Sequence, residues 1–249
     1  MRRFFASMAA MLMLTSLAAC SGTPNDLSGL QDDPYEQANR KIHAFNMGAD
    51  TYVLEPVADA YRNVLPDPAQ KAIANHVEWT GMPSTALNST LQGKWENAGL
   101  AILNFAFNGL TLGLVDIMDE ADKPSYEDFG QTLAAADVAP GEYVVLPLLG
   151  GTTTRGAAGM VVDFMLNPLS ALQAGPAGEV VKTARVPVGT ISLRADNYDL
   201  INQVKYQSPD SYARTRSIFI QMRSAYLADV IVEEGESTVS DDDFESFFE

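Results

Sequence analysis

An uncharged run in the middle of the chain limits what this sequence can fold into. Gly99 to Val115 reads GLAILNFAFNGLTLGLV, 17 residues without a charge, which approaches the length of a membrane span. Polar and glycine residues interrupt the run, and we expect two of the glycines, Gly109 and Gly113, to break or bend a helix there. The run therefore predicts either a buried core helix or a segment that meets a membrane without crossing it.

The N-terminus indicates export and a lipid anchor. Residues 1–19 of MRRFFASMAAMLMLTSLAAC have two arginines, an apolar stretch and a small-residue cleavage region, the layout of a secretory signal peptide. Leu17 to Cys20 resembles the bacterial lipobox, in which the cysteine is acylated, and Ser21 favours the outer membrane. We therefore predict lipid attachment at Cys20; an ordinary signal peptide with an incidental cysteine is the alternative. Several acyl chains would anchor the chain without a protein span.

The charge of the chain argues against nucleic acid as a partner. The sequence has 16 basic and 32 acidic residues, a formal charge of −16, and loss of the two leader arginines would bring it to −18. Nine acidic residues and no basic one lie between Asp229 and Glu249. Because phosphate binding requires clustered lysine and arginine, we expect no nucleic-acid partner.

Composition divides the chain into four parts. Residues 1–19 are the expected leader, and the polar residues 20–32 are expected to form a flexible lipidated tether. Residues 33–233 are long enough for one domain with its own core. Residues 234–249 are acidic and predict a disordered tail.

Helix start signals dominate the folded part. Asp33 and Asp67 each precede a proline, the arrangement of an N-cap followed by the first helical turn. The one convincing extended run is EYVVLPLL at 142–149, and Pro147 keeps it out of a central strand. The sequence predicts a mainly α, single domain of many short amphipathic helices with little or no sheet. Prolines mark the expected starts: Pro34, Pro56, Pro68 and Pro83, with Pro209 before a longer helix.

The chain offers no recognisable catalytic or metal-binding motif. His43 and His76 are its two histidines and Cys20 its one cysteine, so a zinc site would need mostly carboxylate ligands. There is no Gly-x-Ser-x-Gly motif. GGTTTRGAAG at 150–159 lacks a P-loop ending, and we expect a turn and a helix whose small residues let another backbone approach. The prediction is a protein that is not an enzyme and has no metal or cofactor.

Four longer sequence segments resemble those of the MlaA family, also called VacJ, in their order and spacing. They are DPYEQANRKIHAFN (33–46), EPVADAYRNVLPDPAQKAIANH (55–76), NFAFNGLTLGLVDI (104–117) and, within 129–156, FGQTL followed by APGEYVVLPLLGGTTTRG. The resemblance extends over about residues 17–210 and includes the lipobox. Each segment alone is weak evidence for the family. The four segments together, in this order, make the resemblance specific.

The resemblance implies a Gram-negative outer-membrane lipoprotein that maintains lipid asymmetry. Such a protein is a ring of helices lying in the inner leaflet around an amphipathic channel. It associates with trimeric porins, removes phospholipid mislocalised to the outer leaflet and passes it to a soluble periplasmic carrier. Two alternatives stay open: a structural, porin-associated envelope lipoprotein without transport, and a lipid-modifying enzyme such as a phospholipase.

Within this resemblance the uncharged run is expected to enter the membrane from the periplasmic side, with its apolar face toward acyl chains and its asparagines toward the protein interior or channel. The polar loop 122–131 is a candidate gate, with a plain surface loop as the alternative. The candidate channel or membrane-embedded residues are Phe45, Asn46, Asn104, Phe105, Asn108, Gly109 and Gly113. The candidate gating residues are Asp122, Lys123, Pro124, Glu127, Phe129 and Gly130.

Overall fold

The computed structural model describes residues 27, 30, 32–119, 122–166 and 175–232. Cys20, the leader and the acidic tail lie outside these residues, so the expectations for them stay predictions.

Helices make up most of the described chain, which confirms the predicted class. A single two-stranded antiparallel sheet interrupts them, with Tyr143 opposite Thr153 and Leu146 opposite Gly150. The order is α2 (Glu36–Ala49), the π-helix η3 (Asp50–Leu54), α3 (Glu55–Val64), α4 (Asp67–Leu91), α5 (Trp95–Asn108), the 3-10 helix η4 (Gly109–Thr111), α6 (Phe129–Ala135), β1 (Tyr143–Leu146), β2 (Gly150–Thr153), α7 (Thr154–Leu166), α9 (Gly175–Asp196), α10 (Tyr198–Gln207) and α11 (Ser211–Val232).

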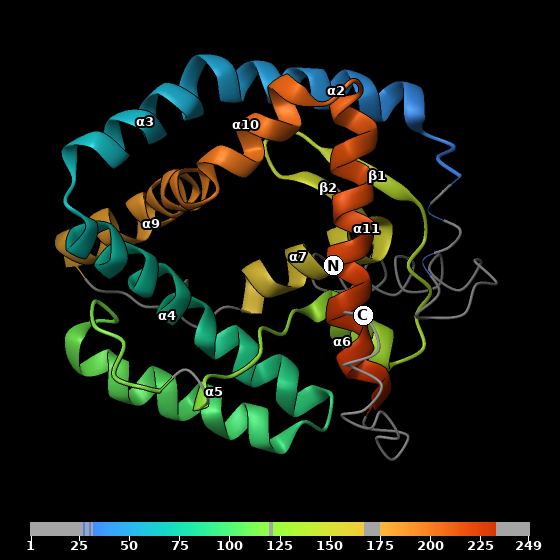
Figure 1. Cartoon of the computed structure of the whole chain (residues 1–249). Helices are drawn as coiled ribbons and strands as arrows, with labels where there is room; N and C mark the ends of the chain where they lie inside the picture. The colour runs from blue at the N-terminus through green and yellow to red at the C-terminus, as the bar shows by residue number, and fades with distance from the viewer. Residues whose placement is uncertain (1–26, 28–29, 31, 120–121, 167–174, 233–249) are drawn as a thin grey trace, which may run out of the picture.

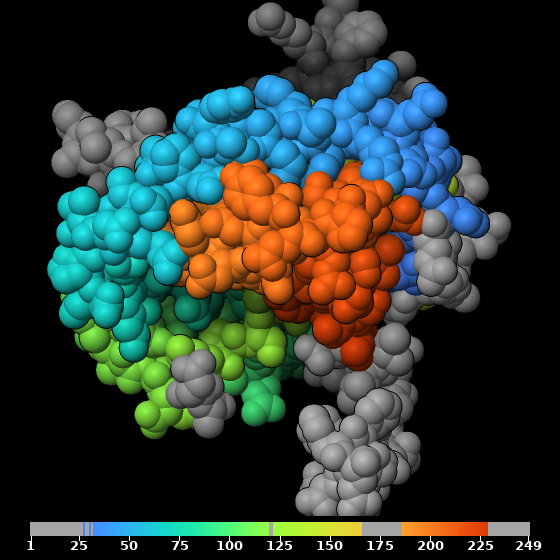
Figure 2. Space-filling view, turned by 45° about the horizontal axis from the view of Figure 1, so that its top comes forward, coloured from blue at the N-terminus to red at the C-terminus, as the bar shows by residue number. Residues whose placement is uncertain are grey.

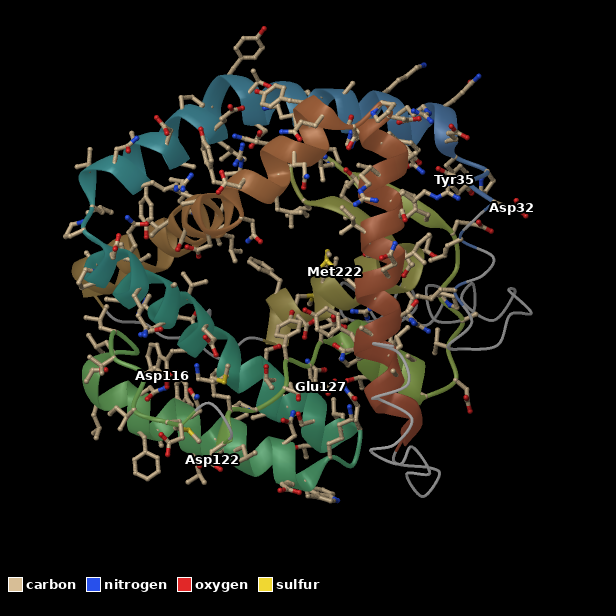
Figure 3. All side chains as sticks on the ribbon, viewed as in Figure 1. Asp32, Tyr35, Asp116, Asp122, Glu127 and Met222 are labelled. Atoms are coloured by element: carbon tan, nitrogen blue, oxygen red, sulfur yellow. The ribbon has the colours of Figure 1, made fainter. Side chains whose placement is uncertain are left out.

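The helices follow one another around a ring (Figure 1), as predicted. α2 and α3 form one side, the α4–α5 hairpin forms the opposite side, and α6, α7 and α11 close the ring. α9 and α10 lie along the inner side of α3 and α2, and the tilted view shows the same neighbours packed together (Figure 2). Side chains project into the centre, among them Met222 of α11 (Figure 3).

Several helices are longer than the sequence predicts. α4 begins at Asp67 with Pro68 in its first turn, as expected, but it runs through Pro83 to Leu91. The prediction that Pro83 opens a new helix is therefore wrong. An internal proline costs about 3 kcal/mol, and the packing of α4 against α5, α6 and α9 stabilises the helix in spite of it. In the same way α9 continues through Pro187.

The hairpin β1–β2 lies where the sequence places its extended run. β1 takes up only Tyr143–Leu146 of this run and ends directly before Pro147. The glycine-rich segment after it differs from the prediction, because Gly150–Thr153 pairs as β2 rather than forming only a turn. Gly150 has φ +84°, a conformation that suits glycine at a hairpin turn.

The apolar core lies where this hairpin meets α6 and α11. Its buried members include Leu27 and Leu30, which the sequence assigns to a flexible tether. Arg216 of α11 donates to the Leu30 carbonyl at 2.6 and 3.0 Å. Burial of both leucines and the hydrogen bonds to Leu30 hold these two residues against the domain, at positions that the sequence assigns to a flexible tether. The buried members are Leu27, Leu30, Ala134, Tyr143, Val145, Tyr212 and Leu227.

Candidate functional site

The uncharged run folds as most of α5, η4 and the first residues of the loop after it, with polar side chains inside and apolar side chains outside. The face of α5 toward α4 buries Asn104 and Asn108, which are 2% and 4% exposed, as predicted for the asparagines. The opposite face is apolar, the reverse of a helix on the surface of a soluble protein. Its exposed large side chains, continuing into η4, are Trp95, Ile102, Leu103, Phe107 and Leu110.

Asn108 hydrogen-bonds both to Asn104 and to the loop that follows η4. Asn108 donates through Nδ2 to Asn104 at 3.1 Å and to Asp116 at 3.0 Å, and its Oδ1 accepts from the Ile117 amide at 2.9 Å. Lys123 pairs with Asp116 at 2.8 Å. Burial raises the pKa of Asp116, but the hydrogen bonds from Lys123 and Asn108 outweigh this and leave the pKa below its usual value. An ionised Asp116 therefore holds the loop closed on α5.

Glycines let this loop lie directly against α4. Gly113 has φ +73°, and a Cβ there would lie 2.5 Å from the Cβ of Trp79. The Trp79 ring stacks on Phe105 with centroids 4.9 Å apart, and its Nε1 donates to the Phe105 carbonyl. Gly109 also lies over the Trp79 ring. The predicted break is confirmed at Gly109, where α5 gives way to η4, whereas Gly113 lies in the loop after η4 has ended at Thr111.

Apolar side chains are exposed on other elements of the ring as well. Tyr52 of η3 is 84% exposed and Val64 of α3 is 77% exposed. Leu148 and Leu149 in the hairpin turn, and Phe164 near the end of α7, are similarly exposed. Soluble monomers rarely expose so much large apolar surface unless it contacts a membrane or a partner. None of the described helices is long and apolar enough to span a membrane.

α2 places Phe45 outward and Asn46 against the hairpin. Phe45 is 57% exposed. Asn46 donates to the Leu146 carbonyl at 2.9 Å and accepts from the Leu148 amide at 2.7 Å. Two turns earlier, Asn39 makes the same pair of bonds to Tyr143 and Val145. The two asparagines thus bind β1 as a neighbouring strand would.

The second half of the predicted gating loop is anchored. Glu127 is 1% exposed and pairs with Lys94 at 2.7 Å. Asp128 caps α6 in a capping box with Gln131 and pairs with Arg223 of α11. These bonds tie residues from Glu127 onward to α5 and α11.

Phe129 and Gly130 are the first residues of α6, and both lie in close contact with α7. The Phe129 amide donates to Asp163 of α7 at 2.9 Å. Gly130 lies against Gly159 of α7, where an added Cβ on Gly159 would lie 2.5 Å from the Gly130 nitrogen. The prediction that the small residues of the segment 150–159 let another backbone approach is confirmed.

The first half of the same loop is more open. Asp122 is exposed, Lys123 forms the ion pair with Asp116, and Pro124 is half-buried. Asn97 of α5 exchanges two hydrogen bonds with the Ser125 backbone, at 2.8 and 3.0 Å. Figure 3 shows Asp122 and Glu127 well apart in the molecule, one at its edge and one toward α11. A gating role for this segment stays a prediction, and it concerns residues 122–126.

A buried ionic cluster connects α2–α3 with α9–α10. Asp50, in the π-helix, accepts from Arg194 at 2.7 Å and from Lys205 at 2.8 Å, and Lys205 also pairs with Glu55 at 2.7 Å. Burial raises the pKa of Asp50, but Arg194 and Lys205 outweigh it and hold the pKa below its usual value. Sequence reasoning missed this cluster, because Asp50 is 144 and 155 residues away from the two cations that bind it.

One nucleophile–base contact exists among the described residues that sequence reasoning did not find. His43 Nε2 and Ser211 Oγ are 3.1 Å apart, and burial lowers the pKa of His43. A hydrolytic triad would also need a carboxylate on the other ring nitrogen. Asp210, adjacent to Ser211, instead binds Arg40 through both carboxylate oxygens. His43 also contacts the edge of the Tyr212 ring, which is a packing role.

Within the described ranges, no three His, Cys, Asp or Glu side chains gather closely enough to hold a metal ion.

Comparison with known proteins agrees with this geometry. The family model described as MlaA lipoprotein matches residues 31–226. An uncharacterized protein of Rickettsia bellii is 34% identical over 201 residues, which cover 78% of this chain and 76% of the relative. An Escherichia coli protein named intermembrane phospholipid transport system lipoprotein MlaA is 29% identical over 215 residues, covering 83% of this chain and 82% of its own.

The fold is similar to that of a solved structure from work on the structural basis for maintenance of bacterial outer membrane lipid asymmetry. The TM-score is 0.67 at 29% identity, and the match covers 78% of this chain and 98% of the other.

Proposed function

This chain belongs to the MlaA lipoprotein family, and on that premise we propose that it transports phospholipid in the bacterial envelope. It removes phospholipid mislocalised to the outer leaflet of the outer membrane and passes it through the ring to a soluble periplasmic carrier. The family match and the names of the relatives support this reading.

The inverted polarity of α5 is the observation that carries the proposal. Its buried face contains Asn104 and Asn108, while Trp95, Ile102 and Phe107 are exposed on the other face. Exposed apolar area of this kind is stable against acyl chains and costly against water. A ring with such an outer surface lies in the inner leaflet, and its interior gives a phospholipid head group a polar route.

The route through the ring is an amphipathic channel in this proposal. Phe45, Phe105 and Gly109 are the apolar or small candidates at the channel or the membrane, and Asn46 is a polar candidate beside the hairpin. Gly113, against Trp79, and the two buried asparagines of α5 shape the neighbouring wall. Movement of residues 122–126 gates the channel.

The anchor and the partners complete the proposal. Cys20, acylated after removal of residues 1–19, fixes the chain to the periplasmic side of the outer membrane, and acyl chains on one residue are sufficient for this. A trimeric porin holds the ring in place, and the soluble carrier receives the lipid at the periplasmic side.

Lipid analysis tests the proposal directly. Mass spectrometry of the detergent-purified protein should find retained phospholipid, and deletion of the gene in its own bacterium should leave phospholipid accumulating in the outer leaflet. Unaltered surface phospholipid in the deletion strain, with altered porin assembly or envelope shape, would favour the structural lipoprotein instead. Lysophospholipid formed on incubation with lipid, and abolished by Ser211→Ala, would show covalent chemistry and contradict a purely transporting role.

A further inference from the structure

A pocket of about 370 Å³ lies between the N-terminal half of α4 and the loop that follows α5. Lys71 and Asn75 line it from one face of α4, since residues four apart in a helix are neighbours. Leu114, Val115, Asp116 and Lys123 line it from the loop side. Figure 3 shows Asp116 between α4 and the chain after α5.

Basic residues outnumber acidic residues among those that line this pocket. Lys71 and Lys123 contribute two ammonium groups, and Asp116 is the one acidic residue among the lining residues. Asp116 is already bound by Lys123 and Asn108. Lys71 forms no ion pair within the part of the chain that the structure describes. In a protein with a formal charge of −16, Lys71 therefore presents to this pocket an ammonium group that no described carboxylate pairs with.

The walls of the pocket are held in place before any ligand binds. His76 Nδ1 lies 2.6 Å from the Leu112 carbonyl oxygen, and Asn75 donates to the Leu114 carbonyl at 3.4 Å. The rim on the loop side is apolar, with Leu114 and Val115 46% and 53% exposed. This rim continues the exposed apolar surface of η4 and α5, so a ligand with a charged end and an apolar end fits both parts.

We propose that this pocket binds the phosphodiester of a glycerophospholipid, as a head-group subsite of the transport function proposed above. The ammonium groups of Lys71 and Lys123 bind the phosphate oxygens, and the acyl chains leave over Leu114 and Val115. Phosphatidylglycerol binds more tightly than phosphatidylethanolamine, because the ethanolamine ammonium would lie beside the ammonium groups of Lys71 and Lys123, whereas the glycerol head group carries no positive charge.

Native mass spectrometry of the lipidated, detergent-purified protein tests this subsite. Phosphatidylglycerol or phosphatidylethanolamine is titrated into wild type, Lys71→Gln, Lys71→Arg and Lys41→Gln. Lys41 is the matched control, because it is an exposed lysine on α2, away from the pocket, and its change removes the same charge. Lys71→Gln should weaken phosphatidylglycerol binding about fivefold, the upper end of what one solvent-exposed ion pair contributes. Lys71→Arg and Lys41→Gln should bind as wild type does.

The outcomes separate the subsite from the transport function. Lipid bound equally by wild type and Lys71→Gln, or an equal loss in Lys41→Gln, would overturn the subsite alone. A wild-type protein that binds no phospholipid would overturn both proposals. Competition with millimolar sodium phosphate distinguishes the ligand sources: phosphatidylglycerol should stay bound, and its displacement would make this a site for free phosphate instead of lipid.

Discussion

At the scale of single residues, asparagine side chains repeatedly hydrogen-bond to the backbone of other segments. Asn39, Asn46 and Asn97 each donate to a backbone carbonyl and accept from a backbone amide of another segment. Asn108 accepts in the same way from the Ile117 amide. An amide side chain supplies both a donor and an acceptor, so it satisfies irregular backbone that would otherwise be left unpaired in the wall of the ring.

Asn39→Asp tests this role. Asn39 is 3% exposed, and its Nδ2 donates to the Tyr143 carbonyl and to Asp33. A carboxylate there would face two oxygen acceptors without a proton to share, and we expect the free energy of unfolding to fall by about 3 kcal/mol. Denaturant unfolding measures this. The control Asn63→Asp changes an exposed residue and should stay within about 0.5 kcal/mol of wild type; equal effects would contradict the role given to Asn39.

The buried His43 predicts a pH dependence. Burial lowers its pKa below the usual 6.5, while Asp210 opposes this and Arg40 adds to it. The unfolded chain therefore takes up the proton at a higher pH than the folded one. Stability from this group is complete above pH 6.5 and is lost as the pH falls from 6.5 toward the folded pKa.

The melting temperature should accordingly fall between pH 7 and pH 5.5, and His43→Gln should reduce that fall. Thermal unfolding at both pH values checks the difference between wild type and variant. An identical fall in both proteins would mean that another group is responsible.

At the scale of elements, glycine decides how closely α6 and α7 approach. Gly130 begins α6, and Gly159 of α7 lies against its backbone. The contact also places Asp163 of α7 within 2.9 Å of the Phe129 amide, so the approach of the two helices and the capping of α6 depend on each other.

Gly159→Ala should separate these helices. Its Cβ would lie 2.5 Å from the Gly130 nitrogen, and overpacking of this kind costs about 2 kcal/mol. Gly81→Ala in α4 is the matched control, since nothing lies within 4 Å of a Cβ there, and it should gain up to about 1 kcal/mol from helix propensity. Denaturant unfolding should thus give opposite signs for the two variants, and a stabilised Gly159→Ala would contradict the close packing.

At the scale of the whole molecule, polar contacts close the ring and apolar side chains remain outside. The cluster of Asp50, Glu55, Arg194 and Lys205 joins α2–α3 to α9–α10, while the apolar core cluster is formed by the hairpin, α6, α11 and the two leucines at 27 and 30. A buried ion pair contributes less to stability than its geometry suggests. It is, however, strongly destabilising to break, which suits the role of fixing one arrangement of the helices.

The exposed face of α5 predicts contact with lipid. The chain has two tryptophans; Trp95 is 71% exposed, whereas Trp79 is covered by Phe105, Gly109 and Gly113. In vesicles containing brominated phospholipid, the fluorescence of Trp79→Phe, which reports Trp95, should be quenched strongly. The fluorescence of Trp95→Phe should be quenched less. Trp95 emission unaffected by the brominated lipid would place α5 away from the membrane.

Much of the fold follows from local chemistry and was within reach of the sequence. Helix start signals before Pro34 and Pro68 predict where α2 and α4 begin within about two residues, and Gly109 marks the end of α5. Pro83 misled the prediction, because proline is a local signal and the packing of α4 on its neighbours outweighs it. Leu27 and Leu30 are a second example: the composition around them is polar, and yet tertiary packing buries both side chains.

By itself, the sequence determined the helical class, the inward-facing asparagines of α5 and the resemblance to one family, because each depends on residue spacing within one segment or on the order of segments. Only the tertiary structure decided which charges meet. Lys94 pairs with Glu127 across 33 residues, Asp50 with Arg194 across 144, and Lys71 shares a pocket with Lys123. Helical periodicity says which face a charge occupies, but the partner on that face depends on how the chain returns around the ring.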